Sequence, residues 1–322
     1  MSPFFIVGCG RSGTTLLRTM LNQHPQIAIP LESLFIIDYL RAKQKPIPVL
    51  QRLMAQEYEL VEWGLEVSVD DLTGCTTAKD LVDRVHELYM RQHGKTIWGQ
   101  KTPRFVRYGE LLRAAYPQAK FIHVVRDSRA VVSSLMRSDV HQSNAYFGAQ
   151  RWVKDVKAGL ALKERYPTDV LEVRYENLVS KPEAVLHEVC SFLGLHFHPA
   201  VLDYQETSAR EYGGYYDKVH SNLKQAPDTS RIEAWRKHLS VKEIAVVELF
   251  CGEVMQRLGY PPDFENPTVE PWRILYLKAQ RFDGIFRQAK HYLLKRPHYL
   301  TCNLRRKARL SLLFKSLSEV NY

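Results

Sequence analysis

The feature that most constrains this chain is a glycine-rich segment close to its start, FFIVGCGRSGTTLLRTMLNQHP, at residues 4–25. Residues 4–7 form a short apolar run ended by glycine, which is typical of a buried strand. Apolar residues then recur at helical spacing over residues 14–22, which predicts a helix. A strand, a glycine turn and a helix in this order predict the opening βα unit of an α/β sheet.

The loop between this strand and helix is suited to binding an anion. Gly8, Gly10 and Gly13 allow tight turns, so that successive backbone N–H groups converge on a ligand at the positive end of the helix. Arg11 adds a planar cationic fork that suits phosphate or sulfate oxygens. The alternative is an ordinary βα turn that happens to be rich in glycine. The predicted binding residues of the loop are Gly10, Arg11, Ser12, Gly13, Thr14 and Thr15.

The loop differs from a standard nucleotide-binding loop at one position. The spacing of Gly8 and Gly13 matches G-x-x-x-x-G-K-[ST], but Thr14 stands where the lysine belongs. A triphosphate with Mg²⁺ normally needs that lysine and an aspartate on a neighbouring strand. The candidate strand FIHVV is followed instead by Arg126, which would repel a metal. We therefore expect a compact anion and no metal. The five scattered cysteines, without a CxxC pair, indicate neither a zinc site nor a disulfide framework.

Short apolar strands and helices alternate along the rest of the first 270 residues. This alternation predicts a parallel sheet with right-handed crossovers, and hence an α/β, P-loop-NTPase-like fold of three layers. Residues 50–75 are ambiguous, and residues 200–228 are expected to form an irregular loop. Ser33 and Asp127 are expected to cap the helices that follow them. Further strands are predicted at 27–29, 97–99, 120–125 and 169–173, and helices at 33–42, 79–92, 106–115, 128–137, 149–165, 183–193, 231–238 and 241–258.

Charge divides the chain into a neutral body and a basic tail. Residues 271–322 contain 12 Lys and Arg against 2 Asp and Glu, whereas the first 270 residues contain 33 of each. The net charge of +10 therefore describes the tail, and charge gives no support for nucleic-acid binding by the body. We predict a domain at 1–265 and a helical, basic, amphipathic extension at 266–322. The extension suits either contact with an anionic membrane surface or helices packed on the body with a solvated basic face.

The sequence indicates neither a targeting segment nor a membrane span. The apolar run at residues 3–7 is too short for a signal peptide and leads directly into the glycine loop. No stretch approaches the roughly 18 apolar residues of a membrane-spanning helix. Since the scattered cysteines favour a reducing compartment, we expect a cytoplasmic protein, with peripheral membrane contact through the tail as an open alternative. No oligomeric state is indicated.

Three further motifs follow the loop RSGTT of residues 11–15. They are VVRDSRAVVSSL at 124–135, VRYENLV at 173–179 and TSRIEAWRKHLS at 229–240. Together these motifs resemble those of the PAPS-dependent sulfotransferases, in the branch that includes the tyrosylprotein sulfotransferases and many bacterial enzymes. The resemblance covers roughly residues 3–260. It implies 3′-phosphoadenosine 5′-phosphosulfate (PAPS) as the donor and adenosine 3′,5′-bisphosphate as the product.

The resemblance implies a role for each motif. The glycine loop would bind the 5′-phosphosulfate, and Arg126 with Ser134 would bind the 3′-phosphate. Eight residues of helix rise about 12 Å and return Ser134 close to the starting face. Tyr175 would lie near the adenosine or its 3′-phosphate. Arg231 and Lys237 would contact phosphate, although their motif departs from the Arg-Lys-Gly of the cytosolic branch.

Some of these residues also have ordinary structural alternatives. Arg126 could form a surface salt bridge with Asp127 or Asp139, although ligands gather at the carboxyl ends of parallel strands. Tyr175 could serve only in packing. Lys101 could be a solvated lysine in the turn KTP.

Sulfuryl transfer needs cationic groups near the leaving oxygen and a base near the attacking hydroxyl. Arg11 can supply the first, and the resemblance adds Lys101. The resemblance implies Glu32 as the base, and the alternative role of Glu32 is charge pairing at the N-terminus of the next helix. Pro103 stands where the cytosolic branch carries its histidine base, and His123 is expected to lie in the core or behind the site.

We therefore expect a metal-independent enzyme that transfers a sulfuryl group from PAPS to an acceptor hydroxyl of a protein tyrosine, a carbohydrate or a small metabolite. The alternatives are a P-loop kinase that transfers phosphate from ATP, and a non-catalytic anion-binding or membrane adaptor. Residues 40–75 and 200–228 are expected to shape the acceptor pocket, but neither segment identifies the acceptor.

Overall fold

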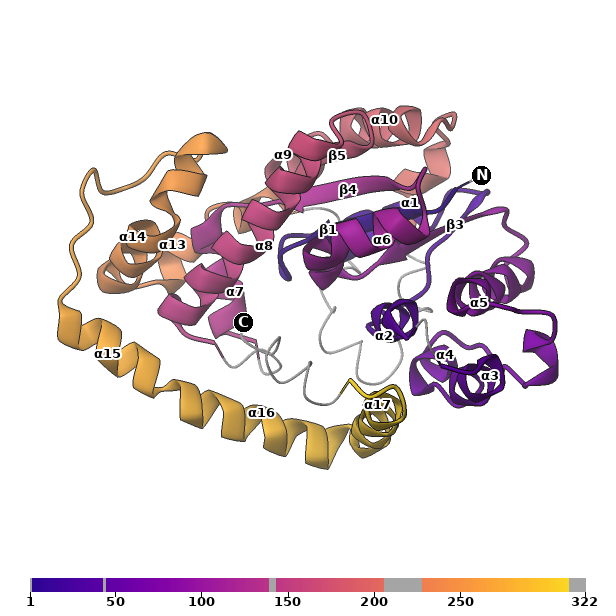
Figure 1. Ribbon diagram of the computed structural model, residues 1–322. Helices are drawn as coiled ribbons and strands as arrows, with labels where there is room; N and C mark the ends of the chain where they lie inside the picture. The colour runs from indigo at the N-terminus through magenta and orange to yellow at the C-terminus, as the bar shows by residue number, and fades with distance from the viewer. Residues whose placement is uncertain (1, 43–44, 139–142, 206–227, 313–322) are drawn as a thin grey trace.

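A computed structural model of the chain describes residues 2–42, 45–138, 143–205 and 228–312. Its centre is a five-stranded sheet in which every pairing is parallel and the strand order is β2-β3-β1-β4-β5 (Figure 1). The predicted central parallel sheet is confirmed, and the fourth strand has the predicted bounds. The strands are β1 (Phe4–Gly8), β2 (Ile27–Ala28), β3 (Ile97–Lys101), β4 (Lys120–Val125) and β5 (Val170–Arg174).

The central strand β1 shows why the strands have unbroken apolar runs. Phe5 and Val7 belong to one hydrophobic core, whereas Phe4 and Ile6 belong to another on the opposite face of the sheet. Helices cover both faces, so both sets of side chains are buried. β1 pairs with β4 along its whole length, and its last residue lies opposite Val124. The loops that follow these two strands therefore begin side by side.

Helices on the two faces complete the three layers that the sequence predicts. One face is covered by α1 (Thr14–Leu21), α9 (Tyr175–Ser180), η3 (Pro199–Leu202) and α10 (Pro182–Leu193). The other is covered by α2 (Phe35–Arg41), α5 (Ala78–Gln92), η2 (Pro103–Tyr108), α6 (Gly109–Ala115) and α8 (Ala145–Arg165). Against α8 pack α7 (Ser128–Met136) and α14 (Val241–Arg257). Asp127 caps α7, as predicted, and Gly194 ends α10.

Ser33 does not cap α2, contrary to the prediction. The helix begins at Phe35 with Leu34 as its N-cap, and the Ser33 hydroxyl is buried without a hydrogen-bond partner among the described residues. The N–H of Leu34 donates instead to Glu59 at 3.3 Å, and the N–H of Ser33 donates to Thr102 at 3.0 Å. These partners lie 25 and 69 residues away along the chain, so a local capping pattern cannot reveal them.

Several short helices lie in segments that the sequence left ambiguous or predicted as one piece. The irregular loop predicted at 200–228 lies mostly outside the described residues. Segment 50–75 contains the end of α3 (Ile47–Met54), α4 (Tyr58–Glu62) and η1 (Asp70–Leu72). The helix predicted at 231–238 is divided into η5 (Thr229–Arg231) and α13 (Trp235–His238).

The tail forms a helical strap along one side of the molecule (Figure 1). It consists of α15 (Pro271–Ala279), α16 (Arg281–Lys295) and α17 (Pro297–Arg309). At its start, the Asn144 side chain donates to the carbonyl of Leu277 at 2.8 Å, and at its end α17 lies beside α4. The predicted helical tail is confirmed, and it packs on the body at both ends. No helix within the described ranges is long and apolar enough to cross a bilayer.

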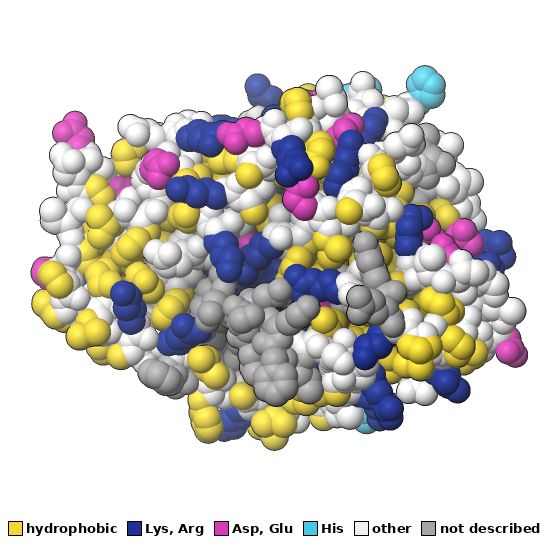
Figure 2. Space-filling model, in the orientation of Figure 1, with side chains coloured by type: hydrophobic (Ala, Val, Ile, Leu, Met, Phe, Trp, Pro, Cys, Tyr) yellow, Lys and Arg dark blue, Asp and Glu magenta, His cyan; other side chains and the backbone are white. Residues whose placement is uncertain are grey.

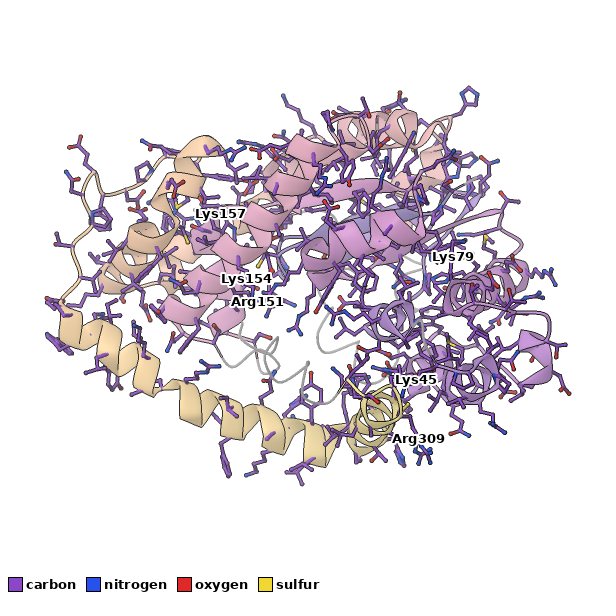
Figure 3. All side chains as sticks on the ribbon, in the orientation of Figure 1. Lys45, Lys79, Arg151, Lys154, Lys157 and Arg309 are labelled. Carbon is purple, nitrogen blue, oxygen red and sulfur yellow. The ribbon has the colours of Figure 1, made fainter. Side chains whose placement is uncertain are left out.

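A buried ion cluster fastens the far end of this strap. Arg306 is 2% exposed, and its guanidinium lies 2.9 Å from Asp38, 2.6 Å from Glu57 and 3.6 Å from Glu59. Burial acts to lower the pKa of Arg306, but the surrounding carboxylates raise it. Arg309, further along the same helix, is exposed (Figure 3). The basic tail therefore attaches to the body through a basic residue that the sequence suggested would be solvated.

Candidate active site

The glycine loop between β1 and α1 has an unusual backbone. Gly8 and Gly13 have φ angles of 148° and 94°, and Arg11 has a φ of 75°. Gly10 does not have a positive φ, so the left-handed position inside the loop is occupied by Arg11 instead. A non-glycine residue in this region is uncommon, and such residues cluster at functional sites. The conformation therefore makes Arg11 itself part of the turn.

The start of α1 is open to an anion. Its N-cap is Gly13, which has no side chain to bond the first N–H groups, and its first turn contains no acidic residue. The unpaired N–H groups and the positive end of the helix dipole therefore favour a negatively charged ligand. The Ser12 hydroxyl is buried and has no hydrogen-bond partner within the described ranges. This donor set fits the phosphosulfate end of the implied donor.

Arg126 lies directly beside this loop. Its guanidinium donates to the carbonyl of Arg11 at 3.2 Å and to that of Arg231 at 2.9 Å, and lies 3.9 Å from the centre of the Tyr175 ring. The Arg126 Nε is buried with no hydrogen-bond partner in the part of the chain that the structure describes. A salt bridge of Arg126 with Asp127 is not formed, since Asp127 pairs with Arg129. Asp139 lies outside the described residues.

Arg11 and Ser134 bring the loop and α7 together. The Arg11 Nε donates to the Ser134 hydroxyl at 3.0 Å. Burial, and then the positive charge of Arg126, lowers the pKa of Arg11. Two guanidinium groups thus lie close enough to repel each other, which favours an anion between or beside them. The structure thus brings together Arg11, Ser134 and Arg126, three of the residues that the sequence assigned to the donor.

Tyr175 covers the loop from the end of β5. A Cβ atom placed on Gly13 would lie 2.4 Å from Cδ2 of the Tyr175 ring, which is closer than any real contact of this kind. Gly13 is therefore required both by its positive φ and by this ring. The ring of Tyr175 therefore packs against Gly13 on one side and contacts Arg126 as well.

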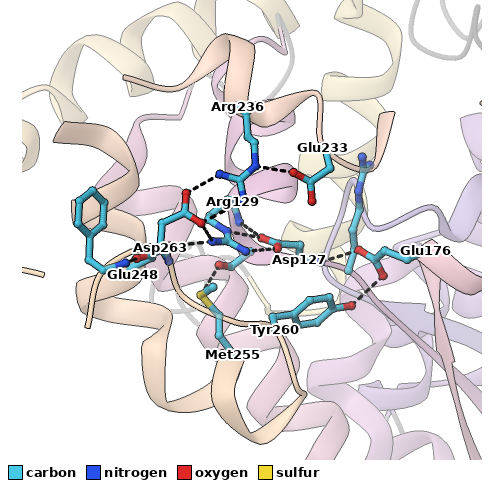
Figure 4. Close-up of polar contacts among 12 residues, drawn as sticks. Asp127, Arg129, Glu176, Glu233, Arg236, Glu248, Met255, Tyr260 and Asp263 are labelled. Atoms are coloured by element: carbon cyan, nitrogen blue, oxygen red, sulfur yellow. Dashed lines mark hydrogen bonds and ion pairs between the residues drawn. The ribbon is translucent and has the colours of Figure 1, made fainter. Parts of the chain in front are cut away.

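A buried polar network behind the site holds α7 in place (Figure 4). Arg129 is 3% exposed and pairs with Asp127 at 2.7 Å, with Glu248 at 2.8 Å and with Asp263 at 3.1 Å. Asp263 also pairs with Arg236 of α13 at 2.6 Å. The network therefore ties α7, α13 and α14 together next to the strand end that carries the site.

Glu176 links this network to the third motif. Its carboxylate accepts from the backbone N–H of Asp127 at 3.1 Å and from the Tyr260 hydroxyl at 2.8 Å. Asp127 follows Arg126, and Glu176 follows Tyr175. The hydrogen bond from the backbone N–H of Asp127 to Glu176 therefore fixes the position of Arg126 relative to Tyr175.

Glu32 and Lys101 form an ion pair on the other side of the loop. Their charged atoms lie 2.5 Å apart, and the lysine also donates to the Thr15 hydroxyl at 3.2 Å. Lys101 is the last residue of β3 and is 3% exposed, so the solvated-turn alternative is wrong. Glu32 is 40% exposed. The N–H group of Leu34 at the start of α2 is satisfied by Glu59 rather than by Glu32.

His123 lies in the core, which is one of the two places predicted for it. Its ring is fully buried inside β4, next to Gly159 of α8, and burial lowers the pKa of His123 to about 4. A Cβ atom on Gly159 would lie 2.2 Å from the ring. This histidine is therefore held neutral by close packing, away from the glycine loop.

Tyr292 on the strap is a residue that the sequence did not single out, and so are Arg104 and Arg151, whose charges act on it. Burial, the largest cause, raises the pKa of Tyr292 on α16, and the charge of Glu32 adds to this effect, whereas Arg104 and Arg151 oppose it. Tyr292 also stacks with Tyr299, with ring centres 5.9 Å apart. The strap thus carries a tyrosine whose ionisation the charge of the candidate base opposes. Of these residues, only Arg104 had a signal in the sequence, because it directly follows Pro103 in the motif that ends β3.

The last motif reaches the site mainly through its backbone. The carbonyl of Arg231 accepts from Arg126, and the guanidinium of Arg231 lies 3.4 Å from Asp228. Lys237 is exposed on α13. The contacts predicted for these two side chains with the donor therefore remain predictions. Within the described ranges, no group of three or more His, Cys, Asp or Glu residues could hold a metal ion.

Comparison with known proteins decides the family. A model of the sulfotransferase family matches residues 3–199, which is more than half of the chain. The chain belongs to the sulfotransferase family. Protein-tyrosine sulfotransferase 1 of Danio rerio is 27% identical over 285 residues, which cover 83% of this chain and 75% of that protein. The nodulation protein NoeE of Sinorhizobium fredii is 24% identical over 288 residues, which cover 81% of this chain and 67% of that protein.

A solved sulfotransferase shares the fold. The sulfotransferase domain of the Synechococcus PCC 7002 olefin synthase superposes with a TM-score of 0.57 and 24% identity, over 80% of this chain and 95% of that domain. The predicted membership of the sulfotransferase family and the predicted fold class are thereby confirmed. The roles of the individual site residues are taken up below as proposals.

Proposed function

We propose that this sulfotransferase transfers a sulfuryl group from PAPS to an acceptor hydroxyl, with Glu32 as the general base. The observation that carries the proposal is the meeting of Arg11 and Arg126 at the glycine loop, where Arg11 also donates to Ser134 of α7. PAPS carries anionic groups at both ends of its ribose, and these two arginines offer cationic groups at two places along one site. The proposal assigns residues 1–265 to the catalytic domain and 266–322 to an extension.

The residues divide between the two ends of the donor. The loop N–H groups, Ser12 and Thr14 would bind the 5′-phosphosulfate at the start of α1. Arg126 and Ser134 would bind the 3′-phosphate. The buried Nε of Arg126 has no partner among the described residues, which supports its availability for such an anion.

The reaction needs one bond to form as another breaks. The acceptor oxygen attacks sulfur, the bond between sulfur and the bridging oxygen of PAPS breaks, and the acceptor proton passes to Glu32. Arg11 and Lys101 stabilise the negative charge that builds on the bridging oxygen. Lys101 contacts both Thr15 at the loop and Glu32, so it lies between the leaving group and the base.

The acceptor would approach from the side of Glu32 and Tyr292. This side receives positive charge from Arg104 and Arg151, and it is bordered by the strap as well as by the body. The acceptor class is a hydroxyl compound, and protein tyrosine, carbohydrate and small metabolite are the candidates for the assay.

The kinase alternative has less support. Thr14 occupies the position of the lysine that a P-loop kinase uses, and the strand that would carry the metal-binding aspartate is followed by Arg126. A kinase would hydrolyse or transfer the terminal phosphate of ATP in a reaction that requires Mg²⁺. A non-catalytic adaptor would keep its function when Glu32 is replaced by Gln.

The Glu32→Gln variant tests the proposal. We expect turnover with sulfur-labelled PAPS to fall by about 10²- to 10⁴-fold, the usual contribution of a general base. Binding of adenosine 3′,5′-bisphosphate, measured by calorimetry, should persist. Glu66→Gln replaces an exposed carboxylate and serves as the matched control. The acceptor panel is scored by mass spectrometry. Unchanged turnover in Glu32→Gln would show that Glu32 is not the base. Absence of nucleotide binding by the folded wild type would show that PAPS is not the donor.

A further inference from the structure

The helices of the strap turn their apolar side toward solvent. On α15 the residues Trp272, Leu275 and Tyr276 are exposed, with Leu275 at 69%. Their spacing of i, i+3 and i+4 places them on one face of the helix. The opposite side attaches α15 to the body, where Leu277 is buried in the core formed with α8. Figure 2 shows hydrophobic side chains along the lower left and lower edges of the molecule, where Figure 1 places α15 and α16.

The next helix, α16, has the same orientation. Phe286 and Leu294 are each 70% exposed, and Ile285 and Leu293 are exposed with them. Polar Gln288 is partly buried on the opposite arc. A surface helix of a globular protein normally buries its apolar stripe and exposes its polar one. The strap reverses this rule over two consecutive helices.

This reversal is local to the strap. Of the twelve large hydrophobic side chains exposed among the described residues, eight lie between Trp272 and Leu304. Single exposed apolar residues are ordinary, whereas a contiguous apolar surface marks a contact with a partner or a membrane. The outward side chains of α15 and α16 therefore form an exposed apolar face of the kind that contacts a partner or a membrane.

Charge indicates what covers this face. Residues 271–309 contain 11 Lys and Arg against a single Asp. A second copy of the chain would bring an equally basic strap against the first, and the two would repel each other. An anionic lipid surface supplies the opposite charge and attracts Lys and Arg residues that lie close to it.

We propose that the outer face of α15 and α16 docks in the interface of an anionic lipid bilayer. Trp272, Tyr276 and Phe286 would lie at the level of the headgroups, the depth that aromatic rings favour. The neighbouring Lys and Arg residues would extend to the lipid phosphates along their aliphatic stems. Both helices are already formed and held by the body at each end, so docking does not need to order a disordered chain.

The test uses the full chain and vesicles. Co-sedimentation is measured with vesicles of equimolar phosphatidylcholine and phosphatidylserine, and with vesicles of phosphatidylcholine alone. The variant F286S/L294S removes two outward side chains from α16. L249S is the matched control, because Leu249 is exposed on α14, outside the strap. Thermal unfolding of the wild type and of every variant shows whether each is folded.

We expect wild type and L249S to bind the anionic vesicles and to dissociate as salt is raised. Binding of F286S/L294S should fall by about tenfold or more, given the apolar area that two such side chains bury. K290E/K295E should lose binding to anionic vesicles in particular. Failure of the wild type to bind at low salt would overturn the proposal, as would equal binding by F286S/L294S. A dimer that dissociates in F286S/L294S, without any vesicle binding, would assign the face to a second copy instead.

Discussion

Two sets of arginines in this molecule have opposite surroundings. Arg129 and Arg306 each lie among three acidic side chains, which come from different parts of the chain. Arg11 and Arg126 lie beside the glycine loop, where their contacts are a serine hydroxyl, two backbone carbonyls and a tyrosine ring. The residue type is the same, but the first set is neutralised by the protein and the second is not.

The pKa values follow this division. Burial acts to lower the pKa of Arg129 and of Arg306, but their carboxylates raise both. Burial and then a neighbouring arginine lower the pKa of Arg11. A buried charge is costly unless it is paired. Arginines with full sets of carboxylates therefore stabilise the fold, whereas unpaired ones at a helix N-terminus indicate a site for an external anion.

The largest effect is expected from Arg306→Ala. Removing this guanidinium leaves its carboxylates buried without a counter-ion, and breaking a buried ion pair typically costs about 3–5 kcal/mol of unfolding free energy. Urea unfolding would measure the loss. Arg309→Ala, on the same helix but exposed, should change stability little. If both variants were equally stable, the cluster would not be what fastens the strap.

The reverse pattern is expected from Arg126→Ala. Its stability should stay close to that of the wild type, while binding of adenosine 3′,5′-bisphosphate weakens roughly 100-fold, the equivalent of about 3 kcal/mol for charge-assisted hydrogen bonds. Calorimetry would measure binding, and urea unfolding would measure stability. A strong loss of stability with unchanged binding would place Arg126 in the structural set.

The pH dependence of stability sharpens the comparison at the Arg306 cluster. Burial, the largest cause, raises the pKa of Glu59 to about 8, against the opposing charge of Arg306. In the folded state this carboxyl keeps its proton up to that pH, whereas the unfolded state loses it near the ordinary value. The unfolding free energy should therefore fall as pH rises from about 5 to 8, by at most about 1.4 kcal/mol per pH unit.

Glu59→Gln should remove this slope. The amide keeps an oxygen that can accept from the N–H of Leu34, so the start of α2 retains its bond. Urea unfolding at several pH values would compare the two proteins. Parallel pH profiles would show that Glu59 is ionised in the folded protein over the whole range.

The smallest effect is expected at Ser134, where a substitution can introduce a carboxylate. Ser134→Asp places an acidic group beside Arg11 and gives it the partner that the structural arginines have. We expect nucleotide binding to weaken about tenfold more than in Ser134→Ala, which only loses a neutral hydrogen bond of about 1 kcal/mol. Calorimetry on both variants measures the difference. Equal affinities would show that nucleotide binding does not depend on the absence of a carboxylate beside Arg11.

Much of the fold and of the donor side could be predicted from the sequence, because local patterns determine them. A strand that ends in glycine and leads into a helix specifies its own βα turn, and Asp127 caps its helix through a bond two residues away. The resemblance implied that Arg126 and Tyr175 both lie near the 3′-phosphate, and they meet because parallel strands bring their carboxyl ends to one edge of the sheet.

The acceptor side and the strap could not be predicted, because their contacts join distant parts of the chain. The bond of Leu34 to Glu59, which replaces the predicted Ser33 cap, depends on where α4 packs. The charge of Glu32 acts on Tyr292 because the strap crosses the molecule. The tail sequence shows basic and apolar residues in one helix, but it does not tell which side faces the body.

The ion cluster of Arg306 also has a consequence for biosynthesis. Ribosomes build a chain from its amino end, and Glu57 is made 249 residues before Arg306. Until α17 emerges, the nascent protein therefore carries acidic groups of α2 and α4 that have yet to receive their counter-ion. Closure of the cluster must wait for α17, long after these acidic residues have been made.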